Sequence, residues 1–371
     1  MARYLFIDQT SGHDPHARKS KPTGGILNSL TLIPEYLASH GHDVYVQSSY
    51  DKTEDVNGVH YVDRQTPVPK WDVAIFNRNV LPKEFLLYCK EIGAKVVWWL
   101  HDIVQLRYLE DDAFKYVDHV VALSDYCKET YCDFYSLNAN KCSVIPNGVD
   151  KELFHPGPYN ERNPNLYITA SALVKGTMPL HSVFMNLKRV NPDVDFRIYS
   201  SQKLHGMNNS PSQEEFLQKM EMDGAHIYRP VSQEVLAHLL RKAHCLLMPN
   251  TYPEICSNLL LQAQASGCPV VTSNIGSAPE FIENRTTGLM TTKYYPHDYY
   301  SWIVEYTNLV FDLSNKELHK TISENASRDV KDWNEIGERW ENVLKMVMAE
   351  PQVLQIHQEA VSIEKVVSVG E

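Results

Sequence analysis

Long apolar runs, paired cysteines and a basic charge are all missing from this sequence of 371 residues. No uncharged apolar stretch approaches the roughly 18 to 20 residues that a membrane-spanning helix needs, so we expect at most peripheral membrane contact. The amino terminus, MARYLFIDQT, has too short an apolar run for a signal peptide and soon reaches a charged residue. We therefore expect a cytoplasmic protein.

The cysteines and the charge exclude further classes of protein. The seven cysteines are an odd number without a Cys-x-x-Cys pair, which argues against a disulfide framework and against a zinc site. We therefore predict reduced thiols and no metal. A formal net charge of −11 argues against a nucleic-acid partner, because affinity for the phosphate backbone depends on clustered cations.

Two phosphate-binding fingerprints are also absent. The sequence has neither the P-loop pattern GxxxxGK[ST] nor the dinucleotide-binding pattern GxGxxG. P-loop ATPases and dinucleotide-dependent dehydrogenases therefore lose their best support.

Apolar segments alternate with helical patterns along the first 150 residues, which indicates a parallel α/β domain. Between the first two predicted strands, Ile26, Leu30, Ile33 and Leu37 recur at helical spacing until Gly41. The near-continuous apolar runs are typical of strands that are buried on both faces. These predicted strands span residues 3–8, 72–76, 94–100, 119–123 and 142–146.

A second α/β series follows a polar segment rich in Pro and Asn at about 150–165, which we interpret as a linker. In this series Ser232 is placed to cap a helix over SQEVLAHLLRKA. Two doubly wound parallel-sheet domains in tandem turn their strand carboxyl ends toward a shared cleft, where ligands normally bind. The predicted strands span residues 166–171, 195–200, 225–230, 244–249 and 268–273.

The segment PEICSNLLLQAQASGC, from Pro253 to Cys268, places polar groups at the mouth of an apolar helix. The helix should begin at 256–258, directly after Glu254. Its first amides and its positive dipole end would then face the cleft. The sequence therefore predicts an anion site beside a carboxylate.

Six motifs now occur in the order typical of one family. The sequence resembles the retaining glycosyltransferases of family 4, which have the GT-B fold of two Rossmann-like domains facing across a cleft. The resemblance covers nearly the whole chain. The motifs are GGI (24–26) with HGHDV (40–44), HD (101–102), IPNGVD (145–150), KG (175–176), PE-x7-Q with GCPVV, and G-x3-E with TGL.

The resemblance implies a division of the chain into four parts. Residues 1–155 would form the amino-terminal, acceptor-side domain, and residues 160–330 the nucleotide-sugar donor domain. Residues 331–350 would form a closing helix that crosses back to the first domain, with Trp333 and Trp340 at helical spacing. The tail at 351–371 receives no role.

The resemblance also implies an activity. Family members transfer a sugar from a nucleotide-sugar co-substrate, here expected to be a UDP- or GDP-sugar, with retention of anomeric configuration and without a metal or other cofactor. The expected acceptor is a glycan, a lipid-linked molecule or a small molecule.

Site residues follow from matching the motifs. Glu254 matches the first carboxylate of E-x7-E, which faces the transferred sugar and can stabilise positive charge at the anomeric carbon. His101 resembles the histidine that meets the donor sugar. Gly24 and Gly25 would let main-chain amides approach the diphosphate, and Lys175 resembles the diphosphate-binding cation.

The donor-binding set also includes the turn that begins the helix after Glu254. Ser257, Asn258 and Leu259 correspond to an amide-rich turn around the sugar and phosphate. Gln262 takes the place of the second glutamate of E-x7-E, which grips the ribose diol in the family. Glu280 belongs to an adjoining loop and helix, where we expect a structural role at least as much as a functional one.

Two departures from the family pattern affect donor binding. Gln262 replaces a carboxylate, which we expect to weaken or retune ribose binding by on the order of 1 kcal/mol. Ala170 stands where the family has an arginine, and Arg78, Arg107 or Arg18 could supply the missing cation. In the polar loop at 10–23, Arg18 and Lys19 are our candidates for acceptor binding.

These departures leave two alternatives open. The chain could be a GT-B-like protein that binds a nucleotide sugar or glycan without turning it over. It could also be a sugar-nucleotide epimerase or a phosphorylase, because the fold serves those reactions too.

Overall fold

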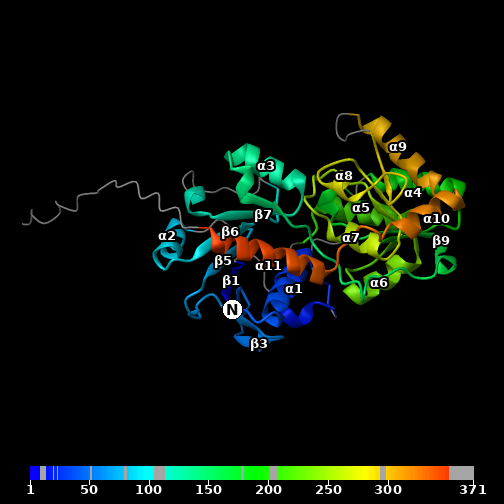
Figure 1. Ribbon diagram of the computed structural model, residues 1–371. Helices are drawn as coiled ribbons and strands as arrows, with labels where there is room; N and C mark the ends of the chain where they lie inside the picture. The colour runs from blue at the N-terminus through cyan, green and yellow to red at the C-terminus, as the bar shows by residue number, and fades with distance from the viewer. Residues whose placement is uncertain are drawn as a thin grey trace, which may run out of the picture.

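The computed structural model describes residues 1–8, 14–19, 21–22, 24–50, 52–78, 82–103, 113–176, 179–200, 208–292 and 298–350. Arg107, the tail at 351–371 and residues 10–13, 20 and 23 of the predicted loop at 10–23 lie outside the described residues. Two parallel sheets, each covered by helices, form the two halves of the molecule (Figure 1). This arrangement confirms the predicted α/β class with two parallel-sheet domains.

The first sheet has the strand order β3-β4-β2-β1-β5-β6-β7-β8, and only the β3–β4 pair is antiparallel. The five predicted strands of this half are present. Strands β2 to β4 were missed, because β2 and β3 are not fully buried and carry too many polar residues to form an apolar run. The strands are β1 (Arg3–Ile7), β2 (Asp43–Gln47), β3 (Glu54–Val56), β4 (Val59–Val62), β5 (Val73–Asn77), β6 (Lys95–Trp99), β7 (His119–Ala122) and β8 (Cys142–Val144).

The described helices of this half are connections between its parallel strands, which require crossovers. Pro34 lies inside the first of them. They are α1 (Gly25–Ser39), α2 (Lys83–Glu91) and α3 (Asp125–Tyr135).

The second sheet has the order β11-β10-β9-β12-β13-β14, with every pair parallel. Ser232 caps α6 by accepting a hydrogen bond from the Val235 amide, as predicted. The two-residue strand β14 was missed. The strands are β9 (Asn163–Thr169), β10 (Asp195–Ile198), β11 (His226–Ile227), β12 (Ala243–Met248), β13 (Val270–Thr272) and β14 (Leu289–Met290). The helices are α4 (Leu180–Val190), α5 (Pro211–Met222), α6 (Gln233–Lys242), α7 (Asn258–Ala265), α8 (Ala278–Phe281), α9 (Tyr299–Asp312) and α10 (Lys316–Asn325).

The chain crosses between the halves at two points that lie side by side. Val149, just after the first sheet, pairs with Asp332 in a parallel bridge, and its amide donates to the Lys331 carbonyl at 2.9 Å. The helix that follows, α11 (Trp333–Ala349), lies against α1, orange-red beside blue in Figure 1. Trp340 packs its ring on Phe6 and Trp99 of the first sheet. The last described helix therefore belongs to the core of the first half.

Each of the seven cysteines is a free thiol. The Cys132 and Cys142 sulfurs lie 3.6 Å apart. Burial raises the pKa of Cys142 to about 12, so this thiol stays protonated at neutral pH and is a poor nucleophile.

Candidate functional site

The candidate site surrounds the start of α7, beyond the carboxyl end of β12. The chain leaves the buried strand at Met248 and reaches α7 at Asn258, within the predicted range of helix starts. The side chain of Ser257, the residue before the helix, makes no capping hydrogen bond. The start of α7 therefore presents main-chain donors and a positive dipole end that its own cap does not use.

Glu254 lies directly before this helix start with its side chain almost fully buried. Its Oε1 pairs with Lys175 Nζ at 2.5 Å, and its Oε2 is buried without a hydrogen-bond partner among the described residues. Its carbonyl accepts hydrogen bonds from the Ser277 amide at 2.8 Å and from Ser277 Oγ at 2.9 Å. Gly276, at φ +60°, makes this corner possible, because a Cβ there would lie 2.5 Å from the Glu254 carbonyl oxygen.

Lys175 reaches Glu254 from the loop after β9. It ends a short 3₁₀ helix, Leu173–Lys175, and its carbonyl accepts a hydrogen bond from the Thr251 amide at 2.9 Å. Gly176 follows at φ +114°, and a Cβ there would lie 2.6 Å from the Thr251 nitrogen. The KG motif therefore fits a close contact between two loops. The Lys175 ammonium also lies 5.9 Å from the centre of the Tyr252 ring.

The glycine pair of the first half meets α7 of the second half. α1 begins at Gly25 with Gly24 as its cap, and a Cβ at Gly25 would lie only 1.7 Å from Asn258 Nδ2. A Cβ at Gly24 would meet nothing within 4 Å. The amino-terminal ends of α1 and α7 therefore approach each other across the two halves. Asn258 Oδ1 is buried there without a partner among the described residues.

Gln262 lies one turn further along α7 and is buried. Its Nε2 donates to Oε1 of Gln233, the first residue of α6, at 2.7 Å. Both amides line a small pocket between the halves together with Asn258. The side-chain amide of Gln262 therefore has a hydrogen-bond partner on α6. The side chain of Leu259, also predicted for the donor side, packs partly buried on the core of the second half, and its donor-side role stays a prediction.

Arg18 and Lys19 line the same pocket. Arg18 pairs with Asp150 at 2.8 Å, and Lys19 Nζ lies 3.8 Å from the same carboxylate. The structure therefore places these acceptor-side candidates beside Asn258 and Gln262, two donor-side candidates. An acceptor role for them remains a prediction.

His101 lies in the first half, beyond the carboxyl end of β6. Its ring packs edge-on against Trp99 at 4.3 Å, and its Nε2 is buried without a partner among the described residues. Burial lowers the pKa of His101 to about 3, so the imidazole is neutral at physiological pH. The next residue, Asp102, pairs with both Nε and Nη2 of Arg78, at 2.9 and 3.2 Å. Arg78 has φ +68°, a backbone conformation that costs energy in a residue other than glycine.

No group of three or more His, Cys, Asp or Glu side chains in the described ranges has a geometry that could hold a metal ion. Among the same residues, no helix combines the length and the apolar character that crossing a bilayer requires.

Two protein-family models match the chain on either side of the linker. The Glycosyltransferase Family 4 model matches residues 79–153, and the Glycosyl transferases group 1 model matches residues 166–307. Together the matched ranges span more than half of the chain. The chain belongs to the group 1, family 4 glycosyltransferases.

Characterised and uncharacterised relatives share the similarity over different lengths. An uncharacterized glycosyltransferase of Methanocaldococcus jannaschii is 24% identical, over 84% of this chain and 77% of that one. The MMP alpha-(1->4)-mannosyltransferase of Mycolicibacterium hassiacum is 26% identical over 50% of this chain. Here the chain spans only 45% of the relative's length.

Solved structures share the fold at low sequence identity. A glycosyltransferase from Rickettsia africae superposes with a TM-score of 0.72 at 16% identity, covering 94% of this chain and 99% of that one. A sucrose-phosphate synthase from Thermosynechococcus elongatus gives 0.73 at 16% identity, over 94% and 100%. These likenesses confirm the GT-B fold that the sequence motifs predicted.

Two features of this glycosyltransferase site were missed from the sequence. Gln233 carries no signal, since a glutamine at a helix start is ordinary and its partner lies 29 residues away. Ser277 lies inside the quoted G-x3-E motif, between Gly276 and Glu280. That motif could have indicated a tight turn, but it could not have indicated that the turn donates hydrogen bonds to the Glu254 carbonyl.

Gly25→Ala tests the approach of α1 and α7. We expect it to lower the free energy of unfolding by about 1 to 3 kcal/mol, because the new methyl collides with Asn258. Gly24→Ala is the matched control and should change it by less than about 0.5 kcal/mol, since its φ of −73° suits alanine and its Cβ has room. Urea denaturation measures both. Equal effects of the two substitutions would contradict the close approach.

Burial of His101 predicts a pH dependence of stability. The unfolded chain binds a proton on this histidine near pH 6.5 and the folded chain only near pH 3, so stability falls as pH drops below 6.5. Between pH 6.5 and 4.5 the loss due to this residue is about 2 kcal/mol. His101→Gln should flatten the stability curve by that amount in urea denaturation across this range. An unchanged slope would contradict a buried neutral imidazole.

Proposed function

We propose that this glycosyltransferase moves a sugar from a nucleoside diphosphate sugar to a hydroxyl of a glycan, lipid-linked or small-molecule acceptor. We further propose that it retains the anomeric configuration and needs no metal. The observation that carries the proposal is the Lys175–Glu254 ion pair beside the start of α7. It brings a cation, a carboxylate and a helix amino terminus into one corner.

The corner suits a donor that carries a negative diphosphate next to a sugar. The positive ends of α7 and α1 attract the diphosphate, and Gly25 leaves the main chain bare at the second of these. Lys175 can exchange its carboxylate partner for a phosphate oxygen, a charge-assisted contact of about 1.5 to 3 kcal/mol. Donor binding would thus open the ion pair and release Glu254 toward the sugar.

Glu254 is then placed to act during bond breaking. When the bond from the anomeric carbon to the diphosphate breaks, its electron pair leaves with the nucleoside diphosphate and positive charge develops on the sugar ring. The Glu254 carboxylate can stabilise that charge. The acceptor oxygen bonds to the anomeric carbon from the leaving-group face, which retains configuration, and its proton passes to the departing phosphate. The neutral His101 imidazole can hydrogen-bond the sugar without adding charge.

One structural neighbour has been solved with nucleotide and nucleotide-sugar ligands. An Anabaena protein, HepE, has been solved with UDP, with UDP and glucose, and with UDP-glucose. Since this likeness is at 16% identity, it carries the fold and not the donor. UDP-sugars and GDP-sugars, which the family resemblance implies, are the first donors to test.

A donor panel tests the proposed function. UDP-, GDP-, ADP- and TDP-sugars are offered with and without mixed acceptors, with and without EDTA, and nucleoside diphosphate release is measured beside thermal stabilisation. We expect acceptor-dependent release with one donor, insensitive to EDTA, and retained configuration in the product by NMR. Stabilisation without release under any acceptor would indicate a binding protein. Donor interconversion without acceptor would indicate an epimerase, and a need for phosphate a phosphorylase.

Glu254→Gln tests the role of the carboxylate. We expect kcat to fall about 100-fold, while donor affinity changes less than about threefold, because the lost charge acts on the transition state. Glu317→Gln, an exposed substitution on α10, is the control and should leave both unchanged. Near-normal turnover of Glu254→Gln would remove Glu254 from the chemistry.

Lys175→Met should instead weaken nucleoside diphosphate binding by at least about tenfold.

A further inference from the structure

Glu280 connects the two halves of the molecule next to the candidate site. It lies on α8 of the second half, yet its carboxylate accepts hydrogen bonds from the main-chain amides of Asp125 and Tyr126, both at 2.7 Å. These are the first two residues of α3, in the first half. The contact therefore joins elements that are more than 150 residues apart in the chain.

The contact supplies acceptors that α3 does not obtain from its own half. The first amides of a helix have no partner inside the helix. In α3 the third of them, from Cys127, donates to the Ser124 side chain, which is the local cap. Glu280 accepts from the two before it, and its negative charge is favoured at the positive helix end. Part of the capping of α3 therefore depends on the other half being in place.

The other end of this connection is the main chain of Glu254. Ser277, directly before α8, donates both its amide and its hydroxyl to the Glu254 carbonyl. Gly276 has φ +60°, and a side chain at this position would collide with the Glu254 carbonyl. The start of α8 is therefore bonded directly to the main chain of the candidate catalytic residue.

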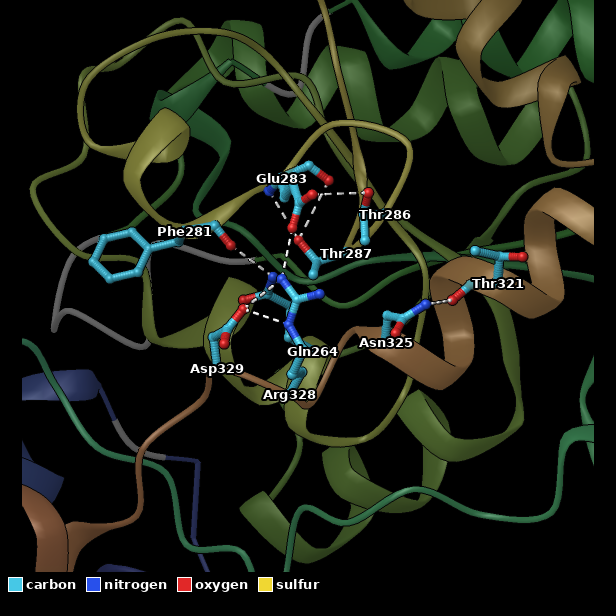
Figure 2. Close-up of polar contacts among 9 residues, drawn as sticks. All are labelled: Gln264, Phe281, Glu283, Thr286, Thr287, Thr321, Asn325, Arg328 and Asp329. Atoms are coloured by element: carbon cyan, nitrogen blue, oxygen red, sulfur yellow. Dashed lines mark hydrogen bonds and ion pairs between the residues drawn. The ribbon is translucent and has the colours of Figure 1, made fainter.

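The far end of α8 is held as well. Gln264 on α7 donates its side-chain amide to the Phe281 carbonyl at 2.7 Å, as Figure 2 shows. In the loop that follows, Thr287 Oγ1 accepts from the Glu283 amide at 2.9 Å, and Glu283 pairs with Arg328 at 2.6 Å (Figure 2). α8 is hydrogen-bonded to α7 and to the main chain of Glu254. A displacement of Glu280 would therefore also displace Glu254.

We propose that Glu280 is a positioning residue that aligns Glu254 with the other half of the molecule. Its carboxylate binds the start of α3 in one half, and α8 and Ser277 pass that constraint to the Glu254 main chain in the other. The inference rests on the proposed transferase function, in which the donor lies between the halves. It assigns Glu280 no contact with the donor.

Kinetics separate this role from a merely structural one. We expect Glu280→Ala to lower kcat about tenfold, while the donor dissociation constant changes less than twofold. Glu280→Gln keeps one acceptor oxygen and so can keep one of the two bonds, and it should recover part of the loss. A residue that only stabilised the fold would shift the melting temperature and leave kcat per folded molecule unchanged in both variants.

Glu283→Ala is the matched control, because this carboxylate follows α8 but binds Arg328 within its own half. It should leave kcat and donor affinity unchanged, since the Glu283–Arg328 ion pair is about half exposed. If it lowered kcat as much as Glu280→Ala, the effect would come from the loop and the inference would fail. Ser277→Ala adds a second check. Its effect and that of Glu280→Ala should be less than additive, because both act through the same carbonyl.

Hydrogen exchange makes the result independent of turnover. In Glu280→Ala we expect faster exchange at the Asp125 and Tyr126 amides and also at the Ser277 amide, which donates to Glu254. An unchanged Ser277 amide would overturn the inference whether or not the enzyme is active. Absence of release from the unaltered protein with every donor would instead reject the proposed function, and the exchange data would still decide the role of Glu280.

Discussion

The close approach of two helix starts, one from each half, is the constraint on which the site depends. α1 and α7 meet where Asn258 occupies the space that a side chain at Gly25 would need. Each helix start carries main-chain donors and a partial positive charge, so bringing two together is unfavourable unless an anion or polar groups lie between them. A negative charge is therefore electrostatically favoured between the two helix starts. In the proposed reaction, the diphosphate of the donor would supply this negative charge.

The two chain crossings hold the amino-terminal ends of α1 and α7 in a fixed position relative to each other. Val149 and Lys331 are bonded side by side, and α11 returns to pack Trp340 into the core of the first half. A hinge made of two adjacent segments restricts the relative motion of the halves more than a single linker would. Glu280 adds a contact on a different element, at the start of α3. The two halves are therefore connected at separate places around the candidate site.

The departures from the family pattern have physical context in the structure. Gln262 is buried against Gln233, and the two side-chain amides share a hydrogen bond of 2.7 Å. Arg18, one of the cations that could replace the missing arginine, lines the pocket beside Gln262 while paired with Asp150. Arg78 is held by Asp102 next to His101. The sequence could name these residues but could not place them, because each contact joins segments far apart in the chain.

The alternation of strands and helices, the family and the order of its motifs could be predicted from the sequence alone. Buried parallel strands require long apolar runs, and tight turns require glycine, so both leave local marks that can be read one segment at a time. Short half-buried strands such as β2 and β3 left no such mark. Three findings required the folded structure. Lys175 pairs with Glu254, Gly25 rather than Gly24 needs to be glycine, and Glu280 caps a helix of the other half. These are contacts between separate segments, and their existence depends on how two sheets are placed relative to each other, which no local pattern of residues encodes.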